Sequence, residues 1–314
     1  MSRLIEDIGA FLNANGFEYS FQIRHDFDVI CARTMDGQHT RVILPLEISA
    51  GTLEEAVKES RMAYEAVLSI RALEGYPIII PEDRWKRQRP MMEARLLAHM
   101  EVFSQAYARN CEVRRIDKET AQRFLNDNHS YGYAACKYRY GLFLKRHTGH
   151  IAREIEEEIF LGCARNDNRS ARGDIVGTLI AVATFSNARK WIKDGKEIRS
   201  YEWTRYASVP ELRVSGGMGK LLKAFIKEVQ PDDIMSYADL EWSEGKVYEA
   251  LGFSEEQPKD PVSFEIDPET WERRAIMRCQ PEQGTTQVEQ DTAGKLYYTN
   301  FGSRKLRLKL TDYQ

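Results

Sequence analysis

The sequence lacks any run of apolar residues that approaches the roughly 18 needed to span a membrane. Residues 1–15 mix acidic with apolar side chains and have no basic head before an apolar core, so they do not resemble a secretory signal. Cysteine is also scarce, because the chain has only five, an odd number whose spacings fit neither a disulfide framework nor paired zinc ligands. We therefore expect a soluble, cytoplasmic protein with free thiols, no membrane partner and no metal site.

An excess of charge of either sign is missing as well. The 45 basic and 48 acidic residues leave a net charge of −3, so the whole molecule exerts no long-range attraction on a polyanion. Any contact with nucleic acid must then be local. The basic runs at 84–89 and 304–309 are interpreted as solvated surface, which is what most charge runs are.

The length of 314 residues suggests two domains, at about 150 residues per domain. The first, residues 1–108, is predicted to be a small α/β domain, to which the sequence assigns no role. A capping box at Thr52 and Glu55 begins its longest helix, and Asp36-Gly37 marks a hairpin turn. Hydrophobic periodicity predicts its elements in the order helix 2–15, strands 17–23, 27–33 and 41–46, helix 52–75, strand 76–80 and helix 82–107.

This α-β-β-β-α-β order also resembles nuclease cores of the PD-(D/E)xK type, in which acidic residues on adjacent strands hold magnesium. Asp28 and Glu47 stand where such carboxylates are expected. The position two after the glutamate, where that family has lysine, is Ser49. Because the order of elements alone does not carry function, we do not expect a working nuclease.

The second domain, residues 109–314, reads as a mixed α/β unit with two irregular segments. A charged insertion is predicted at 146–172, with one candidate strand at 159–164, and a polar loop at 281–294. The remaining pattern predicts helices at 117–129, 219–229 and 245–251, and strands at 138–145, 175–185, 198–207 and 234–238. Phe264 and Ile266 are typical of a further strand, and residues 296–310 predict a terminal strand or hairpin.

A glycine cluster in the second domain is the most informative stretch. Gly216, Gly217 and Gly219 lie between a predicted strand and an amphipathic helix. Free amides at the start of a helix, together with its dipole, suit a pyrophosphate. A tight turn that needs glycine for its backbone geometry explains the same residues equally well. The residues assigned to an anion cradle are Ser215, Gly216, Gly217, Met218, Gly219 and Lys220.

The surrounding segments favour the anion cradle. About 30 residues downstream the chain carries Tyr248-Glu249-Ala250-Leu251-Gly252-Phe253, after a strand that ends in Tyr237-Ala238-Asp239. This succession resembles the core of the GNAT acetyltransferase superfamily, with Gly217 and Gly219 at the two glycines of its loop. Two positions depart from that pattern: Val214 replaces the usual Gln or Arg, and Glu241 replaces the usual Asn.

One branch of that superfamily resembles the chain more closely. Residues 114–310 are similar to the GNAT-related domain of the phage Mom DNA-modification protein and of domains attached to phage endonucleases. The segments that carry this likeness include Arg205, 214–226, 236–239, Trp242-Ser243 and 245–253, with Phe124-Leu125-Asn126, His129 and 141–143 at its start. It implies a phage or mobile-element origin.

The resemblance implies a fold and an activity. The expected fold is α/β (α+β), a GNAT-like mixed sheet flanked by helices. The expected activity is transfer of an acyl group from acetyl-CoA, or a related acyl-CoA, to an amine. The acceptor is a nucleobase in DNA if the Mom likeness holds, and a small or protein amine if only the superfamily does. A non-catalytic module that binds nucleic acid, or is linked to a nuclease, is the remaining alternative.

Roles follow from the needs of acyl transfer, which are a base, an oxyanion donor and an acid for the thiolate. Tyr248 is the expected acid, by resemblance. Asp239, at the end of its strand, is a candidate base or amine holder together with Glu202 and Glu241, and His129 is a further catalytic candidate. Arg205, Glu241, Trp242 and Ser243 are expected to bind substrate. A structural ion pair involving Asp239 and Arg205 explains those two residues equally well.

Overall fold

The structure is a computed structural model that describes residues 2–146, 177–193, 195–276 and 294–313. The predicted insertion 146–172 beyond its first residue, its candidate strand 159–164, and the polar loop 281–294 before its last residue lie outside the described part. The chain is a mixed α/β protein with several sheets, in agreement with the α+β class expected. No helix in the described ranges is long and apolar enough to cross a membrane.

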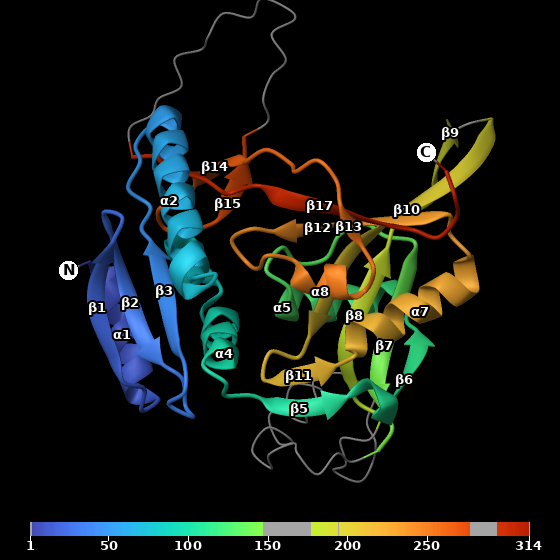
Figure 1. Cartoon of the computed structure of the whole chain (residues 1–314), viewed down its shortest axis with the longest axis horizontal. Helices are drawn as coiled ribbons and strands as arrows, with labels where there is room; N and C mark the ends of the chain where they lie inside the picture. Colours follow the sequence, from blue (N-terminus) through green and yellow to red (C-terminus); the bar gives the residue numbers. More distant parts are fainter. Residues whose placement is uncertain (1, 147–176, 194, 277–293, 314) are drawn as a thin grey trace, which may run out of the picture. The chain divides into compact units, whose positions relative to one another are not determined.

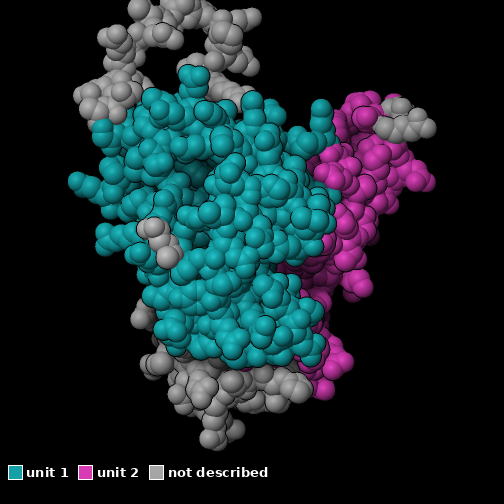
Figure 2. All heavy atoms as spheres, turned by 60° about the vertical axis from the view of Figure 1, so that its left-hand side comes forward, with its two compact units in different colours: residues 1–101, 238–245, 257–304 teal, residues 102–237, 246–256, 305–314 magenta. Residues whose placement is uncertain are grey.

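The chain forms two compact units, neither of which is one continuous segment (Figure 2). Unit 1 combines residues 1–101, 238–245 and 257–304, and unit 2 combines residues 102–237, 246–256 and 305–314. The predicted division into 1–108 and 109–314 differs from these units mainly in the segments 238–245 and 257–304, which fold with the N-terminal hundred residues.

Unit 1 begins with the predicted α-β-β-β-α-β order, which the structure confirms (Figure 1). Its four-stranded sheet has the order β1-β2-β3-β4; β1 to β3 are antiparallel and β4 is parallel to β3. Both bonds of the capping box at Thr52 and Glu55 are present at the start of the long helix. The elements are α1 (Arg3–Ala14), β1 (Tyr19–Arg24), β2 (Phe27–Arg33), β3 (Thr40–Leu46), α2 (Leu53–Glu74) and β4 (Ile78–Pro81).

The helix predicted at 82–107 is wrong. The structure has two helices there, α3 (Glu82–Arg87) and α4 (Arg89–His99), followed by strand β5 (Ser104–Tyr107). Pro90 is in the first turn of α4 and has no amide hydrogen to donate to a preceding turn, so a new helix begins there. The apolar spacing continues through the break, which is why the pattern reads as one helix.

Two apolar clusters on the four-stranded sheet explain which segments belong to unit 1. Leu4 and Ile8 of α1 pack in one cluster with Ile30 and Ile43 of the sheet. In the second cluster, Val67 and Ile70 of α2 pack with alternate strand residues and with Leu240 and Phe301. The later segments also contribute a three-stranded antiparallel sheet, β15-β14-β16, made of β14 (Ser263–Ile266), β15 (Arg273–Ala275) and β16 (Leu296–Thr299).

Unit 2 is organised around an eight-stranded sheet of order β13-β17-β12-β10-β8-β7-β6, with β9 paired to β10 (Figure 1). Strands β6, β7, β8 and β10 are antiparallel neighbours, whereas β10 and β12 are parallel. The strands are β6 (Cys111–Arg115), β7 (Tyr138–Leu144), β8 (Leu179–Phe185), β9 (Arg189–Lys193), β10 (Lys196–Ser208), β12 (Asp233–Asp239), β13 (Ser254–Glu255) and β17 (Ser303–Lys309).

Helices cover both faces of this sheet. Val182 packs with Ala121 and Leu125 of α5 (Lys118–Asn128), while Phe185, three positions along the same strand, stacks on Phe225 of α7 (Gly217–Val229) with ring centroids 3.9 Å apart. Side chains three apart on a strand point to opposite faces, so α5 and α7 lie on opposite sides. A short helix, α8 (Lys246–Ala250), and strand β11 (Leu212–Ser215), which pairs with β5, complete the unit.

Candidate functional site

The glycine turn of unit 2 connects β11 to α7. Strand β11 is held in parallel to β5, and Ser215 at its end accepts a hydrogen bond from the side chain of Gln105 at 2.9 Å. Gly216 then adopts a left-handed conformation with φ 75°, which glycine reaches without strain, and α7 begins at Gly217. Because Gly216 has no side chain, it cannot cap the first amides of α7. These amides and the helix dipole give the turn the electrostatics of an anion site.

Two of the predicted cradle glycines lie close to the protein's own side chains. A Cβ atom on Gly217 would lie 2.9 Å from Val214 Cγ1 and 3.1 Å from the hydroxyl oxygen of Tyr206. A Cβ atom on Gly219 would lie 3.2 Å from Leu251 Cδ2. A side chain at position 217 would therefore force Val214 or its surroundings to shift, whereas one at position 219 would require a smaller movement of Leu251.

Lys220 has a structural contact that the sequence did not indicate. Its ammonium donates hydrogen bonds to the carbonyl oxygens of Ala108 at 2.7 Å and Cys111 at 2.5 Å. The side chain therefore ties the first turn of α7 to the chain entering β6. Met218, the remaining cradle residue, is half-buried in the same turn.

Tyr248 lies beside the point where β10 and β12 stop pairing. The parallel register covers Ser200 to Glu202 of β10 only, and immediately after it the hydroxyl of Ser236 donates to the Trp203 carbonyl at 3.1 Å. Burial raises the pKa of Tyr248, and a hydrogen bond with Ser236 and the positive charge of Arg205 oppose that shift. The phenol is therefore protonated at neutral pH and able to act as a donor.

A second phenol, that of Tyr206, was missed by sequence reasoning. Its ring lies 6.2 Å from that of Trp203, and its hydroxyl lies against Gly217. Burial raises its pKa, and the nearby Tyr248 and Cys111 raise it further. Thr204 is an extra residue of β10 in its pairing with β8, which makes a β-bulge. Because of this bulge, Trp203 and Tyr206 lie opposite Phe185 and Ala183, two residues of β8 that point to the same face of the sheet. Nothing in the sequence pattern marks such a bulge.

Arg205 holds the aromatic loop that follows α5. Its Nε donates to the Gly132 carbonyl at 3.0 Å, and its Nη1 donates to the Thr204 carbonyl at 2.7 Å. Burial lowers the pKa of Arg205, although neighbouring Glu202 opposes that change. His129, in the same loop, is half-buried and accepts a hydrogen bond from the Tyr131 amide through Nδ1 at 3.1 Å. Glu202 and Tyr248 therefore both lie close enough to Arg205 to influence its pKa.

Asp239 and Glu241 belong to unit 1, where they enter a buried ion-pair network. One guanidinium nitrogen of Arg84 lies 3.0 Å from Asp239 and 3.3 Å from Glu241. Arg273 bonds Glu241 at 3.1 Å and also pairs with Asp83. These contacts give both carboxylates structural partners. The ion pair expected between Asp239 and Arg205 is corrected, because Asp239 pairs with Arg84 and the guanidinium of Arg205 donates to the Gly132 and Thr204 carbonyls.

Trp242 and Ser243 follow this network. The indole of Trp242 lies under the Arg95 guanidinium, 4.5 Å from ring centroid to Cζ, and Arg95 also donates to the Glu241 and Trp242 carbonyls. Ser243 is exposed, and its amide donates to the Asp239 carbonyl at 2.9 Å. Both residues are thus part of the turn that the arginines of unit 1 fix in place.

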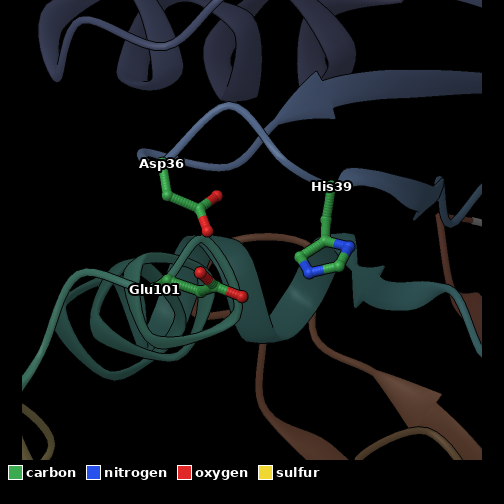
Figure 3. Close-up of side chains that lie close together, drawn as sticks. All are labelled: Asp36, His39 and Glu101. Carbon is green, nitrogen blue, oxygen red and sulfur yellow. The ribbon is translucent and has the colours of Figure 1, made fainter.

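One cluster in the described residues has the composition of a cation site. Asp36, His39 and Glu101 of unit 1 bring potential ligand atoms within 4.8 Å of one another (Figure 3). All three are exposed, Asp36 already accepts bonds from Thr34 and the Gln38 amide, and Glu101 pairs with Arg41. The turn at 34–38 and the ion pair with Arg41 account for the positions of Asp36 and Glu101 without a metal ion. Asp28 and Glu47 are exposed and are not part of this cluster.

Neither a scan against protein-family models nor a search of the curated proteins finds a match for this chain.

Proposed function

We propose that unit 2 is an acyl-CoA-dependent N-acyltransferase with a GNAT-like fold that acts on a primary or exocyclic amine. The order of its elements supports this proposal: an antiparallel run β6-β7-β8-β10, a glycine turn into α7, and a parallel return strand β12. The observation that carries it is the position of Tyr248, a protonated phenol beside the end of the β10–β12 pairing. Open α/β sheets bind ligands outside the carboxyl ends of their strands.

Different residues carry the binding step and the two proton transfers of the proposed reaction. The uncapped amides at the start of α7 bind the diphosphate of the acyl donor. When the amine nitrogen attacks the thioester carbonyl carbon, the carbon–sulfur bond breaks and the Tyr248 hydroxyl gives its proton to the departing sulfur. Glu202 takes the proton released by the amine, because Asp239 and Glu241 are engaged by arginines.

The proposal is tested by measuring how acetyl-CoA changes the melting temperature of the natural protein and of a variant with a negative charge at the glycine turn. A ligand at about 100 times its dissociation constant stabilises the folded state by about 2.7 kcal/mol, which raises the melting temperature. Ser215→Asp adds a carboxylate beside the α7 amides, which favours the apo fold through the helix dipole but repels a diphosphate. We expect the acetyl-CoA shift to disappear in Ser215→Asp.

The matched control adds a carboxylate at another helix start. Lys118→Glu changes the exposed first helical residue of α5 and keeps the full shift if the turn is the binding site. Absence of a shift in the natural protein, or an undiminished shift in Ser215→Asp, contradicts the proposal.

A non-catalytic module is the second candidate function. It is favoured by Lys220, which is bound to two backbone carbonyls, and by the packing of Gly217 and Gly219 against protein side chains. In that case the natural protein shows no acetyl-CoA shift and no acyl transfer to any amine.

A further inference from the structure

A hairpin formed by β9 and the first part of β10 is rich in basic side chains. We call the residues 189–193 and 196–200 the ribbon. Residues 189–199 contain five basic and two acidic side chains, in a chain whose net charge is −3. Within the described residues, Lys190 is paired with Glu197 and Arg199 with Asp232, whereas Arg189, Lys193 and Lys196 form no ion pair. The ribbon is therefore a local positive feature on a weakly acidic protein.

The cross-strand register places like charges against each other at its tip. Lys193 lies directly opposite Lys196 in the antiparallel pairing of β9 with β10. Like charges in directly opposed positions destabilise a sheet. Within the described residues, neither lysine has an ion pair with a carboxylate.

Large apolar side chains are exposed next to these lysines. Trp191 is 39% exposed and Ile192 is 69% exposed, and all five residues of β9 are exposed. Trp191 is on the same face as Lys193, two residues away, and the Arg307 guanidinium supports its ring from 5.3 Å. Arg307 is itself held by ion pairs to Asp233 and Glu256, so the guanidinium that stacks on the indole has a fixed position.

The shape of the ribbon is that of a projecting arm. Strand β9 pairs with β10 alone, and Figure 1 shows the two strands extending together from the rest of the unit 2 sheet. Lysines that only protected a sheet edge from aggregation would not need an exposed tryptophan and isoleucine between them. Positive charge beside an exposed indole instead matches a surface that contacts both phosphates and bases.

We propose that the ribbon binds duplex DNA. A two-stranded antiparallel ribbon fits the major groove of B-form DNA, which is about 12 Å wide. Lys193 and Lys196 contact phosphates on the groove edges, and Trp191 makes the apolar contact inside the groove. The narrow, deep major groove of A-form RNA does not admit such a ribbon. This binding is independent of the acyl donor site at the α7 turn.

Salt-dependent binding of the full chain to a fluorescent DNA duplex tests the proposal. Each phosphate contact contributes about −0.9 to the slope of log K against log salt. Lys193→Glu/Lys196→Glu is expected to lower affinity at least tenfold and to make the slope shallower by about 2. Trp191→Ala is expected to lower affinity about threefold to tenfold without changing the slope, because it removes no charge.

A control variant carries the same change of charge elsewhere. Lys58→Glu/Lys118→Glu alters two exposed lysines, one in α2 and one in α5, and is expected to keep the natural slope. Equal losses in the two double variants show a non-specific polyanion effect and overturn the proposal. If the glutamate variant melts early, Lys193→Gln/Lys196→Gln replaces it, and an unchanged slope in that variant also overturns it.

Two competing ligands complete the test. An RNA duplex of the same sequence and vesicles rich in phosphatidylserine are both expected to bind more weakly than the DNA duplex. Binding of either with equal affinity, and with equal sensitivity to the ribbon variants, contradicts recognition of duplex DNA. Loss of acetyl-CoA binding alone does not bear on the ribbon, since Ser215→Asp leaves it intact.

Discussion

The ring of Tyr248 stands edge-on against the indole of Trp203, with centroids 5.8 Å apart and planes at 83°. Edge-to-face aromatic pairs fix ring orientation and contribute about 0.5–1.5 kcal/mol beyond the area they bury. Because Trp203 is almost fully buried in β10, it holds the Tyr248 phenol in one position at the end of the β10–β12 pairing.

Tyr248→Phe is therefore expected to separate catalysis from binding. The variant keeps the ring contact with Trp203 and loses only the hydroxyl. Loss of a general acid typically lowers turnover by a factor on the order of 10²–10⁴. We expect that loss in kcat, measured by release of free thiol from acetyl-CoA, with an unchanged acetyl-CoA melting shift. Unchanged kcat assigns the proton to another group.

Lys220→Met tests whether the lysine is a ligand for the acyl donor or a structural tie. The substitution removes hydrogen bonds to the Ala108 and Cys111 carbonyls. Unsatisfied buried groups cost about 1–3 kcal/mol each, so we expect a lower free energy of unfolding in urea. The acetyl-CoA melting shift is expected to persist. A stable variant that no longer responds to acetyl-CoA gives Lys220 the role that the sequence predicted.

Local patterns predicted much of the fold of unit 1. The apolar spacing of α1, the hairpin at Asp36-Gly37 and the capping box of α2 are interactions between residues a few positions apart, and all are present. Contacts between distant segments left no such signal. Leu240 and Phe301 join the α2 cluster from over 160 positions away, and no local pattern reveals that partner.

The candidate site was predictable in part for the same reason. The glycine turn is marked by its residue types between a strand and a helix, and Tyr248 was indicated by the family resemblance of the segment that carries it. Tyr206 depends on the bulge at Thr204, and Asp239 depends on Arg84, which is 155 positions away. Hydrophobic periodicity reveals neither a register shift between two strands nor an ion-pair partner that is far away in the sequence.

Alkaline pH is expected to expose the contribution of Tyr76. Its hydroxyl donates to the Leu240 carbonyl at 2.5 Å, and burial raises its pKa well above the usual value near 10. A group whose pKa is raised by folding stabilises the protein below the unfolded pKa, and that stability is lost as pH rises above it. The natural protein should lose unfolding free energy between about pH 10 and 11.5 more steeply than Tyr76→Phe.

Urea unfolding at several pH values measures this difference. At pH 7, Tyr76→Phe is expected to be less stable by about 1–3 kcal/mol, because the Leu240 carbonyl loses its donor. The two curves should converge toward higher pH. Parallel curves across this range show that other buried phenols, such as Tyr140 and Tyr206, dominate the alkaline loss.

The strongest stability effect is expected from Arg273. Its guanidinium pairs with Asp83 and Glu241, whose side chains are 2% and 0% exposed. Removing one partner of a buried ion pair leaves an uncompensated charge and typically costs about 3–5 kcal/mol. Arg273→Met is expected to show that loss at pH 7. Arg33→Met, which breaks a pair between side chains 59% and 80% exposed, should change stability by less than about 1 kcal/mol.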